Sequence, residues 1–153
     1  MSLQIVPLQY TEGQEGDFQW MINSGLYPNS LYVFPESLDM CYLLTAGPQN
    51  QSVRPYNLYG LYSAQPMSAG ICITSDAFGP YQSLSDVGVQ NNIDRFLLQL
   101  TWAISFSAAT TLYFSSNPSP TGGFPPVFDN NGLAVGQEVI DYITTNLYSL
   151  GTF

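Results

Sequence analysis

Three polar segments hold the side chains in this sequence that are best suited to binding or transforming a small molecule. They span residues 35–39, 74–81 and 115–118, and each follows a short apolar run. They offer hydroxyls, a carboxylate or an amide, together with backbone N–H groups that can hold a phosphate without any lysine. Ordinary Pro/Gly turns have the same composition, so turns without a ligand stay the alternative interpretation.

Two pairs of carboxylates and one arginine are the charged candidates. Glu36 and Asp39 lie in the first polar segment. Glu138 and Asp141 are three residues apart in a predicted helix whose other face is apolar, so a solvated face is the simpler interpretation. Arg54 either lies where an anion binds or pairs with a nearby acid.

The charge composition excludes several kinds of chemistry. The chain has no histidine and no lysine, two arginines and a formal net charge of −9. These absences exclude a Ser-His-Asp triad, a Schiff-base lysine and a Walker-type phosphate loop. Two cations are too few for nucleic acid or for an anionic membrane. We therefore expect no nucleic-acid partner, no membrane partner, no metal and no cofactor, and we favour a non-enzymatic role.

The elements that must position these residues alternate between strands and helices. Strands are predicted over residues 3–8 (at an edge), 31–34 (ended by Pro35), 67–74 and 109–115. Helices are predicted from Phe18 (capped by Asp17, with Leu26 on its apolar face), over 86–106 (capped by Ser85 or Asp86) and over 136–150. Residues 39–63 are predicted as a long loop that contains a short helix or strand.

The inner strands are continuously apolar, which favours a largely parallel sheet covered by helices on both faces. At 153 residues, the chain is predicted to form a single α/β domain, 1–153. Cys41 and Cys72 lie in apolar stretches, where buried free thiols are the simpler prediction and a disulfide is the alternative. Residues 1–10 lack the basic start and apolar core of a signal peptide, and no apolar run approaches the length of a membrane span, so we expect a soluble protein.

Five short segments in the same order resemble a family of small macrodomain-like proteins from bacteria, phages and large viruses. They are Leu31–Phe34, Val53–Tyr56, Gly70–Thr74 with Tyr81–Leu84, Ile93–Asp94, and Val135–Ile143. The resemblance implies a Rossmann-like three-layer fold that binds ADP-ribose or a related nucleotide derivative without catalysis. The contacts that it implies are Gly47, Asn50, Arg54, Thr74, Ser75 and Asn117.

The sequence departs from the family pattern where glycines are expected. Residues 45–50 replace a glycine-rich loop, Thr74 and Ser75 replace a glycine pair, and residues 129–132 replace a late glycine-rich turn. Glycine allows a pyrophosphate to approach the backbone closely. The alternative hypothesis is therefore a structural protein that assembles with copies of itself on a retained α/β scaffold. Its tyrosine-rich and lysine-free composition suits a surface that packs against itself, as in a homo-oligomer. A hydrolase of ADP-ribosyl groups would need a positioned carboxylate or water, which the sequence does not identify.

Overall fold

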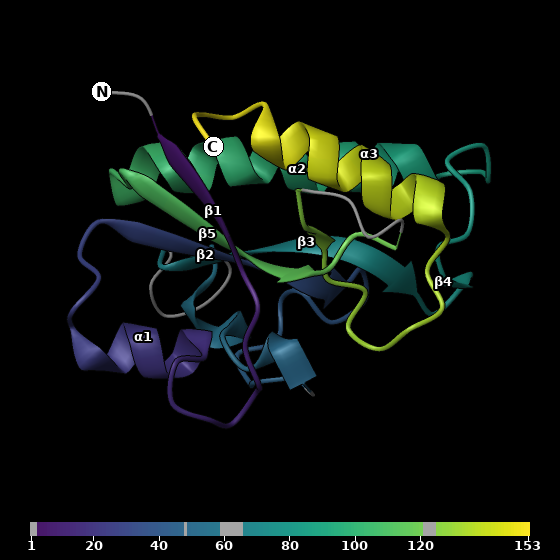
Figure 1. Ribbon diagram of the computed structural model, residues 1–153. Coiled ribbons are helices and arrows are strands. Elements are labelled where there is room, and N and C mark those ends of the chain that lie inside the picture. Colours follow the sequence, from purple (N-terminus) through teal and green to yellow (C-terminus); the bar gives the residue numbers. More distant parts are fainter. Residues whose placement is uncertain (1–2, 48, 59–65, 121–124) are drawn as a thin grey trace.

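A computed structural model describes residues 3–47, 49–58, 66–120 and 125–153. Its central element is a curled, mostly parallel sheet with helices on both faces (Figure 1). In chain order the elements are β1 (Gln4–Leu8), α1 (Phe18–Ser24), β2 (Ser30–Ser37), the short 3-10 helices η1 (Gln49–Gln51) and η2 (Arg54–Tyr56), β3 (Ser68–Ser75), β4 (Gly79–Pro80), α2 (Val89–Ser107), β5 (Thr111–Asn117), β6 (Val127–Phe128) and α3 (Gln137–Tyr148).

The strands lie in the order β1-β5-β2-β3-β4, with β6 paired to β5. The first four of these strands are mutually parallel, whereas β4 and β6 are short antiparallel additions to β3 and β5. The predicted fold class is therefore confirmed as mixed α/β with a largely parallel sheet. Membership of the macrodomain-like family stays a prediction.

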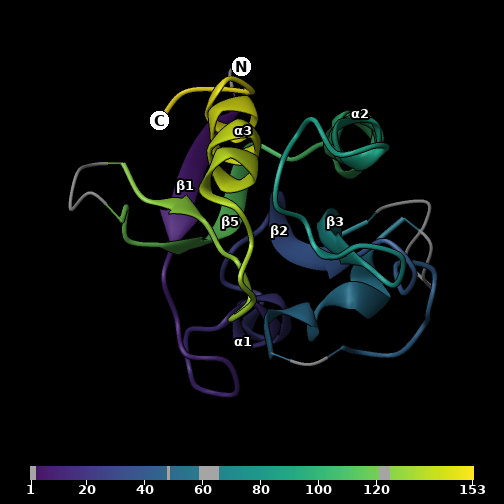
Figure 2. The same ribbon diagram turned by 90° about the vertical axis from the view of Figure 1, so that its right-hand side faces the viewer.

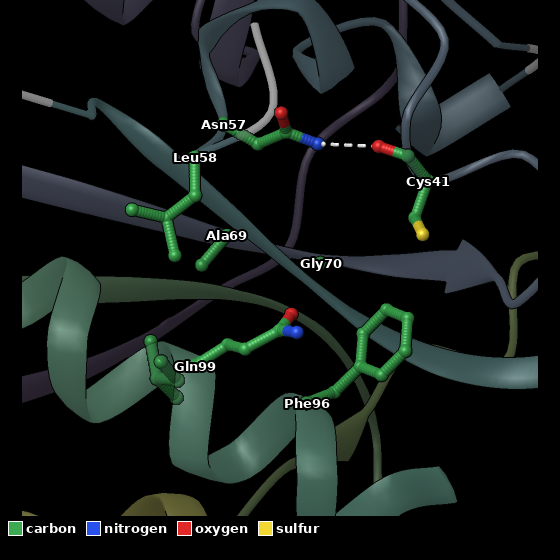
Figure 3. Close-up of a pocket in the computed structure, with 8 residues that line it drawn as sticks. Cys41, Asn57, Leu58, Ala69, Gly70, Phe96 and Gln99 are labelled. Atoms are coloured by element: carbon green, nitrogen blue, oxygen red, sulfur yellow. Dashed lines mark hydrogen bonds between the residues drawn. The ribbon is translucent and has the colours of Figure 1, made fainter. Parts of the chain in front are cut away.

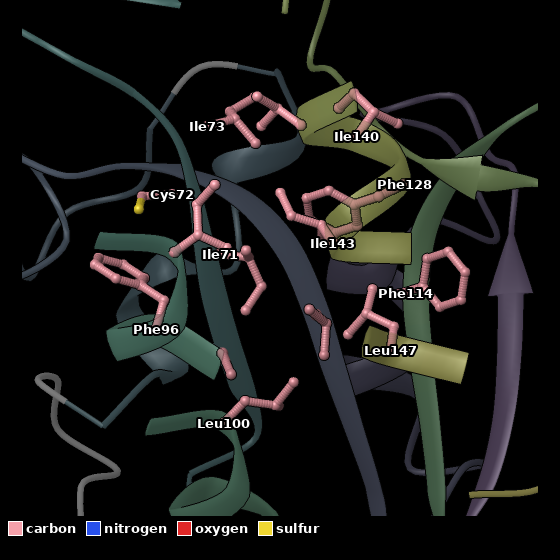
Figure 4. Packing of buried hydrophobic residues seen from close by; sticks show 14 of the residues in the cluster. Ile71, Cys72, Ile73, Phe96, Leu100, Phe114, Phe128, Ile140, Ile143 and Leu147 are labelled. Carbon is pink, nitrogen blue, oxygen red and sulfur yellow. The ribbon is translucent and has the colours of Figure 1, made fainter. Parts of the chain in front are cut away.

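Two apolar layers cover the sheet. Helices α2 and α3 lie over one face, and α1 with the two short 3-10 helices lies over the other (Figure 2). The first layer includes Ile71 and Ile73 of β3, Leu100 of α2 and Ile143 of α3, all fully buried (Figure 4). The second and smaller layer joins Phe18 of α1 to Phe34 of β2. Strands β2 and β5 contribute side chains to both layers, which explains their continuous apolar runs.

Several predicted boundaries are wrong, one because of sheet pairing and two because of local backbone conformation. Strand β2 continues through Pro35 to Ser37, because its pairing with β5 ends at Val33 and the missing N–H of the proline leaves no donor unpaired on that side. Helix α2 begins at Val89 after Gly88, which has a φ of 85°, so neither Ser85 nor Asp86 is its cap. Leu26 lies beyond α1, which ends at Gly25 with a φ of 69°.

Other predictions are confirmed. The Asp17 carboxylate accepts the Trp20 N–H at 2.8 Å and caps α1 as expected. Strand β1 lies at the sheet edge and the final helix begins after Gly136. Short helices do occur within 39–58, and the part of the predicted loop at 59–63 falls outside the described residues. No helix in the described part of the chain is both long and apolar enough to cross a bilayer.

Candidate functional site

The predicted site residues gather at the edge of the sheet where the parallel strands have their carboxyl ends. There the short antiparallel strands β4 and β6 pair with the ends of β3 and β5, so that Thr74 pairs with Pro80, and Asn117 pairs with Val127. The Thr74 carbonyl accepts the Leu38 N–H at 3.0 Å, and the Ser75 hydroxyl accepts the Phe78 N–H at 3.2 Å. The Thr74 carbonyl and the Ser75 hydroxyl are therefore engaged in hydrogen bonds within the chain at the end of β3.

Arg54 is engaged by a buried acid. Its Nε donates to Glu36 Oε2 at 2.8 Å, and its Nη2 donates to Glu36 Oε1 at 2.6 Å and to Gln51 Oε1 at 2.9 Å. The arginine is 3% exposed and the glutamate 0%. Of the two interpretations of Arg54, the structure shows the pairing with an acid. A two-pronged pair of this kind cancels the positive charge that an anionic ligand would need.

Gly47 lies against this ion pair. A Cβ at Gly47 would lie 2.5 Å from Gln51 Oε1 and 2.8 Å from Arg54 Nη2, closer than non-bonded atoms approach. The Gly47 N–H also donates to the Gln51 carbonyl at 3.0 Å. The absence of a side chain at Gly47 therefore lets the loop close over Arg54.

Asn50 and Asn117 meet around a carboxylate that was not among the residues predicted from the sequence. Asp129 is 5% exposed. It accepts hydrogen bonds from the Ser115 hydroxyl at 2.7 Å, the Asn117 amide at 3.2 Å and the Asn131 N–H at 2.8 Å, and also from the Asn50 amide. The two predicted asparagines thus serve as donors to an internal acid. Its place in the Asp-Asn-Asn-Gly turn, rich in turn residues, was the only signal for it.

Tyr10 lies within electrostatic reach of three carboxylates near this edge, Glu12, Asp129 and Asp17. Burial raises the pKa of Tyr10, and the Ser115 hydroxyl opposes that shift. Burial also raises the pKa of Glu12. The charge of Asp17 adds to this increase, and a hydrogen bond from the Ser52 hydroxyl partly opposes it. We name the set formed by Glu12, Glu36, Asp129 and the residues bonded to them the carboxyl-edge cluster. Among the described residues, the one arginine of this cluster, Arg54, is paired with Glu36. The other carboxylates therefore leave the cluster with a negative net charge.

The two carboxylate pairs do not form acid–base sites. Glu36 faces Arg54, whereas the Asp39 carboxylate accepts the Asp76 N–H at 2.5 Å. Glu138 and Asp141 are exposed, as the solvated-face interpretation predicts. Hydrogen bonds from the Ser83 hydroxyl and then from the Leu84 N–H lower the pKa of Glu138.

Both cysteines are protonated, buried thiols at neutral pH. Cys41 and Cys72 are free and buried, so the prediction of free thiols is confirmed. Burial raises the pKa of Cys41 to about 11 and that of Cys72 to about 12, which keeps both in the less reactive thiol form. Within the described ranges, no group of three or more His, Cys, Asp or Glu side chains is arranged to hold a metal ion.

The outer face of helix α2 carries a second candidate surface. Leu98, Trp102 and Phe106 are 51%, 47% and 56% exposed, at intervals of four residues. Only the buried side of this helix was predicted from the sequence. The spacing of these three residues by four positions is also visible there and was the signal for the exposed side. Side chains four apart lie on one side of a helix, so these three form a single stripe, which we name the α2 stripe.

Comparisons of this chain with protein-family models, with curated proteins and with solved structures found no match.

Proposed function

We propose that this protein is a self-associating structural component whose α2 stripe packs against a second copy of the chain. The observation that carries the proposal is the exposure of a leucine, a tryptophan and a phenylalanine in one row on a well-formed helix of 19 residues. Contiguous apolar surface of this kind is typical of interaction sites, whereas isolated exposed apolar residues are ordinary.

The spacing of the stripe suits pairing with an identical copy. Each step of four residues advances about 6 Å along the helix, with Trp102 in the middle. When two copies of α2 lie antiparallel about a two-fold axis at Trp102, Leu98 of one copy faces Phe106 of the other. Such a contact is self-complementary and closes on itself, as in most dimers.

Charge supports a second copy as the partner. The chain has a net charge of −9, which makes copies repel one another unless they meet at a neutral surface. Helix α2 carries only two charged residues, Asp94 and Arg95, which have opposite signs and lie before the stripe. The exposed neighbours of the stripe, Thr101 and Ser105, are uncharged. Interfaces favour aromatic residues and exclude lysine, and this helix follows both tendencies.

The stripe consists of three large side chains, whereas a standard interface involves about 20–30 residues on each partner. We therefore expect weak association, with a dissociation constant in about the micromolar range or above. Weak contacts suit a component that works at high local concentration.

Light scattering over a range of protein concentrations tests the proposal. The wild-type mass is expected to rise from one chain of 16.8 kDa toward at least twice that value. Trp102→Gln is expected to keep the protein monomeric at concentrations where the wild type associates. Leu26→Gln is the matched control, because Leu26 is 69% exposed but lies after α1, away from α2. A wild-type protein that stays monomeric at millimolar concentration would contradict the proposal.

Binding of ADP-ribose or a related nucleotide stays a separate prediction. The carboxyl-edge cluster does not favour it, because the polar side chains of Arg54, Asn50 and Asn117 bond internal acids. Calorimetry with ADP-ribose and NAD is the test. Saturable heat that Asn117→Ala abolishes would establish a nucleotide site, and we expect no such heat.

A further inference from the structure

We propose that a pocket between α2 and the segment 38–42 binds a small monocarboxylate with a flat apolar body. This inference is independent of self-association. The pocket has a volume of about 180 Å³ and is lined by Leu38, Cys41, Tyr42, Arg95, Phe96 and Gln99. It adjoins a deeper recess, which shares Cys41, Phe96 and Gln99 and reaches β3 at Ala69 and Gly70 (Figure 3).

The recess exists because β3 changes side-chain size along its length. Near its end, Ile71 and Ile73 fill the space beneath the helices. At its start, Ala69, which shares a face of the strand with Ile71, is too short to do so. Gly70 lines the recess without a side chain, and a Cβ there would instead meet Glu36 Cβ at 2.7 Å. The Phe96 and Gln99 side chains extend from α2 toward this gap (Figure 3). The recess itself has a volume of about 10 Å³, which is room for one water, so an aromatic ring would lie in the 180 Å³ pocket against Leu38 and Phe96.

The mouth of the pocket carries the second of the two cations in this chain. Arg54 is neutralised by Glu36, but Arg95 makes no ion pair within the described residues and contacts the Asn92 amide oxygen only at 3.5 Å. Asp94, its neighbour in sequence, accepts a hydrogen bond from the Tyr142 hydroxyl instead. A guanidinium can bind a carboxylate through two parallel hydrogen bonds, which combine charge with geometry.

The surroundings select the class of anion. Burial keeps the Cys41 thiol protonated, with a pKa of about 11, so it does not act as an internal anion for Arg95. The site offers one cation in a chain of net charge −9, which suits one negative charge better than the two of a phosphate monoester. The neighbouring Gln99 amide can donate a further hydrogen bond. An apolar floor with one guanidinium at the mouth therefore matches an aryl carboxylate.

Benzoate is the probe, measured by ligand-detected NMR or calorimetry at protein concentrations below those of self-association. We expect saturable binding with a dissociation constant in about the millimolar range, given nine non-hydrogen atoms. Benzamide, which has the same shape without the charge, and inorganic phosphate are expected to bind at least about tenfold more weakly, because charge-assisted bonds to arginine are lost or mismatched.

Two charge variants on α2 test whether benzoate binds at this pocket. Arg95→Gln is expected to weaken benzoate binding about tenfold or more, whereas Asp94→Asn, which changes an adjacent exposed charge, leaves binding equal or slightly tighter. Trp102→Gln, which removes the proposed association, is expected to bind benzoate like the wild type. Absence of benzoate binding, equal binding of benzamide, or undiminished binding by Arg95→Gln would each overturn the inference.

Discussion

At the carboxyl edge of the sheet, polar side chains from distant parts of the chain bond one another and are largely buried. On the outer face of α2, three large apolar side chains project from a regular helix and remain about half exposed. In the first region, Glu36 accepts two hydrogen bonds from Arg54, and Asp129 accepts hydrogen bonds from the side chains of Asn50, Ser115 and Asn117. Within the residues that the structure describes, the α2 stripe has no such internal partners, so we interpret it as a surface for contact with another molecule.

The position of residues in a fold therefore identifies a binding site only when their side chains are not already bonded to other residues of the chain. Open parallel sheets bind ligands at their carboxyl edge, which is where the three polar segments that follow apolar runs in the sequence come to lie. Here, however, that edge is a network of internal hydrogen bonds. Unsatisfied surface, such as an apolar stripe or an unpaired arginine, is the better guide to what this protein contacts.

The largest effect is expected from breaking the buried ion pair of the carboxyl-edge cluster. Glu36→Ala leaves the Arg54 guanidinium buried without its carboxylate, so we expect the free energy of unfolding to fall by about 3–5 kcal/mol. Urea denaturation measures it. The double variant Glu36→Met with Arg54→Met is the control, and it should recover part of the loss because no charge is then left unpaired. A loss below about 1 kcal/mol for Glu36→Ala would mean that the pair is open to water.

The next effect concerns Asp129. Asp129→Asn keeps the size of the side chain but replaces one accepting oxygen with a donor that faces the Asn50 or Asn117 amide. We expect a loss of about 1–3 kcal/mol, measured by thermal or urea unfolding. Asp141→Asn, at an exposed position of α3, is the matched control and should change stability by less than about 0.5 kcal/mol. Equal behaviour of the two variants would show that the Asp129 network contributes little.

Substitution in the α2 stripe, unlike substitution in the carboxyl-edge cluster, is expected to leave the stability of the monomer nearly unchanged. Trp102→Gln is expected to change the free energy of unfolding of the monomer by at most about 1 kcal/mol, because the side chain is half exposed. Leu100→Ala, two residues earlier and fully buried, should lose about 2–5 kcal/mol. Unfolding measured at low protein concentration distinguishes them. A loss for Trp102→Gln as large as that for Leu100→Ala would assign Trp102 to the core rather than to a contact surface.

The smallest effect is a dependence on pH at Glu12. Burial raises the pKa of this carboxyl in the folded state, so the ionised form destabilises the fold above the folded pKa, and the penalty disappears as the pH falls to the unfolded value near 4.3. Glu12→Gln is therefore expected to be slightly more stable than the wild type at pH 7 and equal to it at about pH 4. Denaturation curves at both pH values test this. A variant that is less stable than the wild type at pH 7 would reverse the sign of the effect.

Local patterns predicted most of the fold, because the interactions that form these elements lie close in sequence. The Asp17 cap, the end of α1 at Gly25 and the buried face of α2 all depend on residues within a few positions of one another. The extent of β2 depends instead on which neighbour pairs with it at Pro35, and that is a property of the sheet.

The site was less predictable, because its contacts join residues that are far apart in the sequence. Arg54 meets Glu36 across 18 positions, and Asn50 meets Asp129 across 79. No local pattern specifies either contact. The position of the predicted residues at one edge followed from topology, but whether their polar groups face a ligand or each other depended on these distant partners.

The fluorescence of Trp102 as a function of protein concentration tests the central proposal most directly. In a Trp20→Phe variant, Trp102 is the single tryptophan of the chain and reports only on the α2 stripe. Its emission is expected to shift to shorter wavelength, and its quenching by acrylamide to fall, over the concentrations at which the mass increases. A tryptophan that stays equally accessible while the protein associates, or a protein that does not associate, would contradict the role of the α2 stripe.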